Sequence, residues 1–224
     1  PVDCALGKTC FVQKLVDVDP GPGVLDYRCT ALGENGHTGT DIRVLSAEAA
    51  QANVTVMAAA AGTVGRTRDG VADKLVLTGA DAAAASPIGL GNAVVLDHAN
   101  GYQTIYAHMR KGSVKVRAGD QVEAGAPLGI LGYSGAAAFA HVHFEVRFKG
   151  ELVDPFLGTL TKAKCLTEPS ALGDRGLWTK AALEALSHPP TLLLQSGFAG
   201  TAVDLGSLER GPAAVAPATS TAAG

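Results

Sequence analysis

The sequence has few charged and few aromatic residues for its length. Charged side chains make up 17% and aromatic side chains 5% of 224 residues, whereas about 25% charged is usual for a globular domain. A net charge of −3 argues against a nucleic-acid-binding protein and against a polybasic membrane-surface protein. No apolar run approaches the ~20 residues that a transmembrane helix needs. What remains is a globular protein that binds neither nucleic acid nor the bilayer interior.

The four cysteines contain no Cys-x-x-Cys pair, which argues against a thiolate zinc ribbon and a thioredoxin-type redox motif. Their even number favours structural disulfides and an oxidising compartment, the alternative being four separate buried thiols. Four cysteines allow three pairings. We expect Cys4–Cys10, which closes a small loop, and Cys29–Cys165, which would join the two flanks of the central region.

Glycine and proline are frequent, with 28 and 11 residues, so the chain has many turns. Between residues 53 and 157, short β-branched runs such as 53–57 and 74–78 are bounded by Gly or Asp, as strands are. No helical periodicity of useful length precedes residue 160. We therefore predict an all-β fold with an antiparallel sheet at its core.

The composition divides the chain into four parts. An N-terminal extension (1–34) precedes a central domain (35–160), and a C-terminal extension (161–210) follows it. A short helix is expected at 177–186, before a Pro-Pro pair that ends it. The Ala/Pro/Ser/Thr-rich end, residues 211–224, is expected to be a disordered tail.

The dipeptide Asn100-Gly101 predicts a two-residue hairpin turn, because both central positions of a type I′ turn need positive φ. In that register Val95 lies opposite Tyr106, and His108 shares a face with Tyr106. His98 lies on the other face. We therefore expect His98 to take no part in a site that uses His108.

His37 and Asp41 are separated by Thr-Gly-Thr, and together they could hold a metal ion. In an extended strand their side chains would lie roughly 13 Å apart, too far to share one ion. The intervening residues form helices poorly. A tight turn at Gly39 could fold Asp41 back towards His37. Alternatively, both are ordinary surface residues of a glycine turn.

The segment 141–148 alternates polar and apolar residues and is predicted to be a strand. His141 and His143 then emerge on one face, while Val142 enters the core. Two adjacent imidazoles suit a metal ion, or one metal ligand beside one acid/base. Glu145 continues the polar face, where it could orient a ligand histidine. It could equally be a solvent-facing carboxylate on an edge strand.

Three motifs in this order resemble those of the lysostaphin/LytM-type zinc endopeptidases, the M23 peptidases. They are His37-x-Gly-x-Asp41, the segment 92–109 that ends in Tyr-Ala-His-Met, and His141-Val-His143-Phe-Glu. The stretches 61–64 and 116–129 match as well, so the resemblance covers residues 35–157. It implies a β core related to the barrel-sandwich hybrid of biotinyl and lipoyl domains. The loop 135–140 lacks the Ser/Thr-Gly-Pro-rich sequence that is common in the family. The departure affects the expected wall of the substrate groove and not the expected metal site.

Carried over residue by residue, the resemblance implies one Zn²⁺ per chain held by His37, Asp41 and His143, with His108 and His141 as catalytic histidines. Two imidazoles and a carboxylate leave a fourth zinc position open, as catalytic sites do. There is no His-Glu-x-x-His motif, so no glutamate base of the thermolysin kind is expected. The non-ligand histidines must then move the proton and stabilise the oxyanion.

The expected function is hydrolysis of peptide bonds in the stems or cross-links of bacterial peptidoglycan. The alternative is a non-catalytic member of the same fold, which binds cell wall or activates an amidase. Degenerate relatives of that kind lose zinc ligands, whereas all five motif positions are present here. We expect a monomer that is periplasmic or secreted, with peptidoglycan peptides as its partners.

Overall fold

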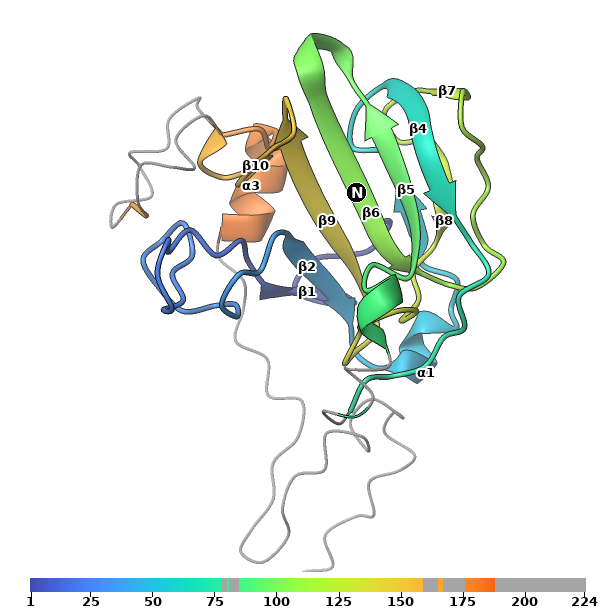
Figure 1. Cartoon of the computed structure of the whole chain (residues 1–224), viewed down its shortest axis with the longest axis horizontal. Helices are drawn as coiled ribbons and strands as arrows, with labels where there is room; N and C mark the ends of the chain where they lie inside the picture. Colours follow the sequence, from blue (N-terminus) through green and yellow to red (C-terminus); the bar gives the residue numbers. More distant parts are fainter. Residues whose placement is uncertain (78–79, 81–84, 159–164, 167–175, 188–224) are drawn as a thin grey trace, which may run out of the picture.

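The computed structural model describes residues 1–77, 80, 85–158, 165–166 and 176–187 (Figure 1). It is a mainly antiparallel β structure with few helices, which confirms the predicted fold class. The strands are β1 (Cys10–Lys14), β2 (Thr40–Val44), β3 (Thr55–Met57), β4 (Gly62–Arg68), β5 (Asn92–Asp97), β6 (Tyr102–Met109), β7 (Gln121–Val122), β8 (Pro127–Ile130), β9 (His141–Phe148) and β10 (Glu151–Val153). The helices are α1 (Ala47–Ala50) and α3 (Lys180–Ser187), and the 3₁₀ turns are η1 (Ser86–Ile88) and η2 (Ala99–Gly101).

One large sheet dominates the molecule, with strand order β1-β2-β9-β6-β5-β4-β7, and β10 pairs with β9. Strands β3 and β8 form a separate two-stranded sheet. Figure 1 shows β9 and β6 side by side in the large sheet, with β2 and β1 beyond β9 and β5 and β4 beyond β6. Strand β9, which carries the two adjacent histidines, is therefore central rather than at an edge.

Side-chain alternation along β9 divides the large sheet into two faces. Val142, Phe144 and Val146 are buried in the hydrophobic core. The core also includes Val56 of β3 and Leu128 of β8, so the small sheet packs against this face. The polar residues of β9 lie on the opposite face, which we call the metal face.

The N-terminal and C-terminal flanks meet behind the core face of the large sheet. The rings of Tyr27 and Phe156 stack with centroids 4.2 Å apart. Trp178 lies 5.4 Å from Phe144 and 5.7 Å from Phe156, again between ring centroids. Segments before and after the central strands are therefore part of one packed unit.

Both predicted disulfides are present, Cys4–Cys10 and Cys29–Cys165. The second bridges 136 residues of sequence and joins the segment before the first motif to the segment after β10. In the chain-entropy view, closing such a long loop stabilises the fold by up to about 5 kcal/mol.

The strand predicted at 74–78 is not formed by its described residues, whereas the predicted helix is observed with shifted bounds. Residues 74–77 form no strand, and the nearby pairing is an isolated bridge between Asp73 and Ser134. The helix expected at 177–186 is observed as α3, which begins three residues later than expected.

The expected tail at 211–224, and most of the expected extension at 161–210, lie outside the described residues. Within the described part of the chain, no helix is long and apolar enough to cross a membrane.

The predicted two-residue hairpin turn is wrong. The loop between β5 and β6 contains the three residues of η2, with positive φ at Asn100 and Gly101. The extra residue shifts the register, so Val95 pairs with Ile105 instead of Tyr106. Asn-Gly indicated the turn correctly, but not the number of residues in it.

Asp154 is a fully buried carboxyl at the end of β10. Its Oδ1 accepts hydrogen bonds from the backbone N–H groups of Phe156 and Leu157, at 2.7 and 3.4 Å. Burial, with a smaller contribution from the Asp26 carboxylate, raises the pKa of Asp154 to about 7. The folded state therefore holds this proton more tightly than the unfolded chain does.

We predict that the free energy of unfolding falls by up to about 4 kcal/mol between pH 4 and pH 7 because of Asp154. Its contribution is full below the unfolded pKa of 3.8 and is lost as the pH rises through the folded pKa of about 7. Urea unfolding across this range measures the slope. Asp154→Asn should remove the part of this pH dependence that Asp154 causes. If the free energy of unfolding changes with pH in the variant as it does in the wild type, Asp154 is not its source.

Candidate metal centre

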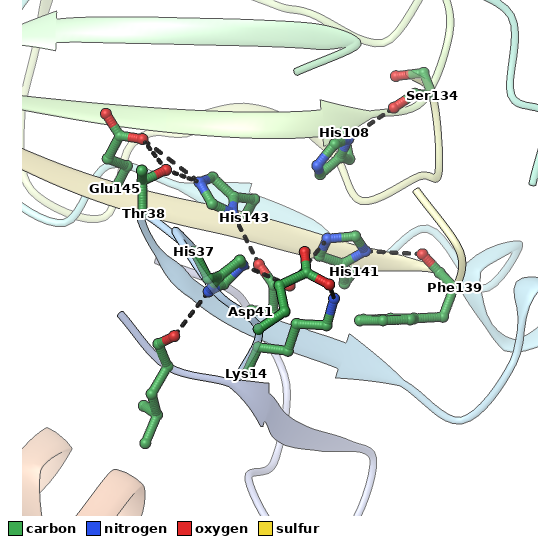
Figure 2. A network of polar contacts seen from close by, with 12 residues as sticks. Lys14, His37, Thr38, Asp41, His108, Ser134, Phe139, His141, His143 and Glu145 are labelled. Carbon is green, nitrogen blue, oxygen red and sulfur yellow. Dashed lines mark hydrogen bonds and ion pairs between the residues drawn. The ribbon is translucent and has the colours of Figure 1, made fainter. Parts of the chain in front are cut away.

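The carboxylate of Asp41 lies at the centre of a histidine cluster (Figure 2). Its Oδ2 is 3.1 Å from His37 Nε2, and its Oδ1 is 2.9 Å from His143 Nδ1. The chain bends at Gly39 and enters β2 at Thr40, which brings the first two side chains together. The predicted approach of His37 and Asp41 is therefore seen in the structure.

Gly39 is needed because the ring of His143 lies against it. A Cβ at this position would meet His143 Cε1 at 2.6 Å and the Phe144 carbonyl at 2.8 Å. Gly39 is required for its lack of a side chain and not for an unusual backbone angle. The space it leaves allows β2 and β9 to approach, so that Asp41 and His143 pair across the two strands.

Hydrogen bonds on the outer side of each candidate ligand histidine orient its ring. His37 Nδ1 is 2.8 Å from the Leu15 carbonyl, to which it donates, so the lone pair is on Nε2. His143 Nε2 lies 3.4 Å from Thr38 Oγ1 and 3.6 Å from Glu145 Oε2. These contacts favour a hydrogen on Nε2 and leave Nδ1 to face Asp41.

Glu145 is buried on the central strand β9, so its interpretation as a solvent-facing residue of an edge strand is wrong. Thr38 Oγ1 donates to its Oε2 at 2.6 Å, and Arg147 Nε donates to its Oε1 at 2.5 Å. Although burial disfavours the charge, hydrogen bonds from His143, Thr38 and Arg147 lower the pKa of Glu145. The group is thus an ionised carboxylate behind His143, where second-layer carboxylates orient metal-ligating histidines.

His37, Asp41 and His143 have the donor atoms of a zinc site. One potential ligand atom from each lies within 4.8 Å of the others. Two imidazole nitrogens and one carboxylate oxygen are the ligands that catalytic zinc prefers. Although burial disfavours its charge, His141 and hydrogen bonds with His143 and His37 hold the pKa of Asp41 well below its usual value. The residues therefore fit a divalent cation.

His108 reaches the metal face because β6 departs from regular strand geometry at this residue. Its φ is +60°, a conformation that non-glycine residues seldom adopt. Its ring lies 4.6 Å from that of His141 and 5.9 Å from that of His143. Tyr106, two residues earlier, instead packs on Phe144 in the core. The prediction that His108 and Tyr106 share a face is wrong, because the alternation breaks at His108.

Asn92 and Ser134 hold the chain around His108. Asn92 Nδ2 donates to the carbonyls of Met109 and Val71, at 3.0 and 2.8 Å. Ser134 Oγ donates to the same Met109 carbonyl at 2.6 Å and accepts from Asn92 N at 2.9 Å. The Ser134 carbonyl accepts from His108 Nδ1 at 2.8 Å. Periodicity could not have identified these residues, since their role depends on loops that meet only in the fold.

His141 lies on the metal face beside Asp41. Its Nδ1 is 2.8 Å from the Phe139 carbonyl, and its Nε2 is 3.5 Å from Asp41 Oδ2. Burial lowers the pKa of His141, and burial lowers the pKa of His108 well below the usual value. Both rings are thus neutral at pH 7, each with one nitrogen that donates to a backbone carbonyl and one that carries a lone pair.

His98 lies away from this cluster. Its Nε2 is 2.7 Å from Thr104 Oγ1, and Thr104 in turn donates to the Tyr106 hydroxyl on the core face. The expected separation of His98 from His108 is therefore observed. Its cause is the backbone reversal at His108 rather than the predicted hairpin register.

Residues 35–155 match a family model described as Peptidase family M23. Among curated proteins, the DD-carboxypeptidase/endopeptidase Mpg of Neisseria meningitidis serogroup B is 40% identical over 67 residues, 30% of this chain and 15% of Mpg. The murein hydrolase activator EnvC of Escherichia coli is 36% identical over 67 residues, 30% of this chain and 16% of EnvC. The chain thus spans only a small part of the length of these relatives.

Two solved structures are similar. The catalytic domain of a mutant of the prophage-encoded M23 protein EnpA from Enterococcus faecalis has a TM-score of 0.45 and 23% identity, over 67% of this chain and 92% of that one. A zinc-containing peptidase from Vibrio cholerae has a TM-score of 0.41 and 21% identity, over 65% of this chain and 39% of that one.

We predict one zinc ion per purified chain and none in His37→Ala, because two remaining ligands cannot hold zinc tightly. Elemental analysis by mass spectrometry after dialysis measures the ratio. His98→Ala is the matched control and should retain the metal. Stoichiometric zinc in His37→Ala would overturn the ligand set.

Asn92→Ala should lower the free energy of unfolding by about 2 kcal/mol, because it leaves buried backbone groups without partners. It should also broaden or shift the His108 ring resonances in long-range ¹H–¹⁵N NMR spectra, since the Met109 carbonyl loses a donor. Ser134→Ala, which keeps the carbonyl that accepts from His108, should have the smaller effect on those resonances. Unchanged His108 resonances in Asn92→Ala would contradict this account.

Proposed function

The chain belongs to peptidase family M23, and we propose that it is a zinc-dependent endopeptidase that cleaves peptide bonds in peptidoglycan stems or cross-links. The observation that carries this proposal is the complete histidine–aspartate cluster. Three side chains suited to zinc lie beside His108 and His141 on one face of the sheet. The name of the relative Mpg, a carboxypeptidase/endopeptidase, supports the same chemistry.

His37, Asp41 and His143 would hold the metal, and the remaining side chains around them determine how it is used. Bound zinc supplies a Lewis acid that polarises a peptide carbonyl and makes water nucleophilic at neutral pH. Glu145 and Thr38 hold the His143 ring from behind, so that Nδ1 faces Asp41. Because Glu145 and Thr38 hold a ligand histidine in place, proton transfer is left to the histidines that do not bind the metal.

His108 and His141 are the proposed acid–base groups. Each is neutral, and each donates from Nδ1 to a backbone carbonyl, that of Ser134 or Phe139. Nε2 of each ring can therefore accept a proton from water or, once protonated, donate one to the leaving amine or the developing oxyanion. Because their rings are 4.6 Å apart, both can act on one scissile bond.

The alternative is a protein that activates another wall hydrolase, as the name of the relative EnvC states for that protein. Activation through a protein surface needs no metal and no acid–base pair. Buried ionised and imidazole groups are costly to keep without a chemical use. The intact cluster therefore supports the enzyme over the activator.

An exported location, periplasmic or secreted, follows from the same proposal. Two disulfides require an oxidising compartment in most organisms. Peptidoglycan also lies outside the cytoplasmic membrane, where such a protein would meet its substrate. We propose that the chain acts there as a monomer with one zinc ion.

We predict that His108→Ala and His141→Ala retain zinc but lose turnover by about 100-fold or more, because an acid–base group is removed while the ligands remain. Digestion of purified peptidoglycan, followed by mass spectrometry of the released muropeptides, measures activity and identifies the bond. His98→Ala should match the wild type.

Two outcomes would contradict the assignment. Loss of zinc from His141→Ala, together with its retention in His143→Ala, would show that the two strand histidines have exchanged roles. Zinc-loaded wild type that releases no muropeptide, but stimulates an added amidase, would identify the activator instead.

A further inference from the structure

Strand β1 contains a bulge that places Lys14 on the metal face. Val12 pairs with Ile42, and both side chains are buried in the core. The register then shifts, and Lys14 rather than Gln13 pairs with Asp41. An inserted residue reverses the faces of the side chains that follow it. Lys14 therefore shares a face with Asp41, whereas regular alternation would turn it towards the core.

The ammonium group of Lys14 lies over an aromatic ring that contacts the site. Its Nζ is 5.7 Å from the ring centroid of Phe139, and the Phe139 ring is 4.4 Å from that of His141 (Figure 2). The guanidinium of Arg43 is 4.9 Å from the same Phe139 centroid. Two cations and one ring thus border the cluster on the side of His141.

Of these two cations, Lys14 is the one that can exchange its partner. Arg43 is buried and donates to the carbonyls of Val44 and Leu45. Lys14 pairs with Glu34 at 2.7 Å, and the Glu34 side chain is 63% exposed. An ion pair with so exposed a partner contributes little free energy. A carboxylate brought by a ligand can replace Glu34 at small cost.

We propose that Lys14 binds a carboxylate of the peptide substrate and thereby selects peptides with a free carboxyl group near the scissile bond. The proposal rests on the function proposed above and adds a determinant of its specificity. Lys14 precedes the residues matched by the family model, 35–155, so the determinant belongs to the N-terminal extension. The carboxylate can be a peptide's C-terminus or a side chain, and peptidoglycan stems carry both.

The test uses synthetic cross-linked stem peptides in four forms. The C-terminal carboxyl is free or amidated, and independently the side-chain carboxyl next to the cross-link is free or amidated. For the wild type, kcat/KM should fall about 10-fold when the recognised carboxyl is amidated. The carboxyl whose amidation lowers kcat/KM is the one that Lys14 binds.

Three variants separate charge from packing. Lys14→Met should lose the preference for the free carboxyl, and Lys14→Arg should keep most of it. Glu34→Gln removes the competing acid, so it should increase the preference without altering Lys14. Lys115→Met, which removes an exposed lysine between β6 and β7, is the matched control and should behave as the wild type.

Calorimetric binding of the same peptides to His108→Ala provides a readout that needs no turnover. Tighter binding of the free carboxyl, lost on adding Lys14→Met, supports the proposal even if no peptide is hydrolysed. Absence of hydrolysis by the wild type overturns the proposed function alone. Equal binding of all four peptides to His108→Ala, or a preference for the free carboxyl that persists after Lys14→Met is added, overturns the role of Lys14.

Discussion

A carboxylate can be buried in a protein only when positive or hydrogen-bonding groups surround it. Asp41 is surrounded by His37, His143 and His141, each with a ring nitrogen 2.9–3.5 Å from one of its oxygens. Its charge is compensated when these rings are protonated, and a cation held by Asp41, His37 and His143 would compensate it when they are neutral. The three rings come from a loop and from a strand more than a hundred residues later, so satisfying this one charge requires β2 and β9 to pair. Glycine at position 39 permits that pairing, because the His143 ring occupies the space of its missing side chain.

The two faces of β9 differ in the side chains that they carry: one face belongs to the hydrophobic core, and the other carries the buried polar cluster. One face contributes Val142, Phe144 and Val146 to the core, and the aromatic rings of both flanks pack behind it. The other face carries polar groups that are nevertheless buried, and each has a specific partner. Glu145 illustrates the difference, since it is held by Thr38 and Arg147 rather than by water. A site of this kind is preorganised, because its side chains have few other conformations that satisfy their hydrogen bonds.

Departures from regular strand geometry bring additional side chains to the metal face. At His108, a positive φ turns the ring away from the core, and the hydrogen bonds of Asn92 and Ser134 hold the backbone in that conformation. At the end of β1, an extra residue does the same for Lys14. The sheet supplies the scaffold through regular alternation, and irregular positions add groups that alternation would have hidden. Strain of this kind is commonly found at functional sites.

The sequence alone determined the all-β class and the grouping of His141 with His143 on one face, because these depend on composition and short-range periodicity. For the cysteines it allowed three pairings, and the structure confirmed the one that we expected from their order in the chain. The motifs also identified the five residues proposed as ligands and acid–base groups, although their roles stay predictions. Only the tertiary structure decided the face of His108, the burial of Glu145 and the presence of Lys14 beside Phe139. Period-two alternation assumes an unbroken strand, so a residue with positive φ, such as His108, or a bulge, such as the one before Lys14, reverses the predicted face of the side chains. Such irregular positions depend on contacts with segments that are distant in the sequence. The alternation of polar and apolar residues within one strand does not reveal those contacts.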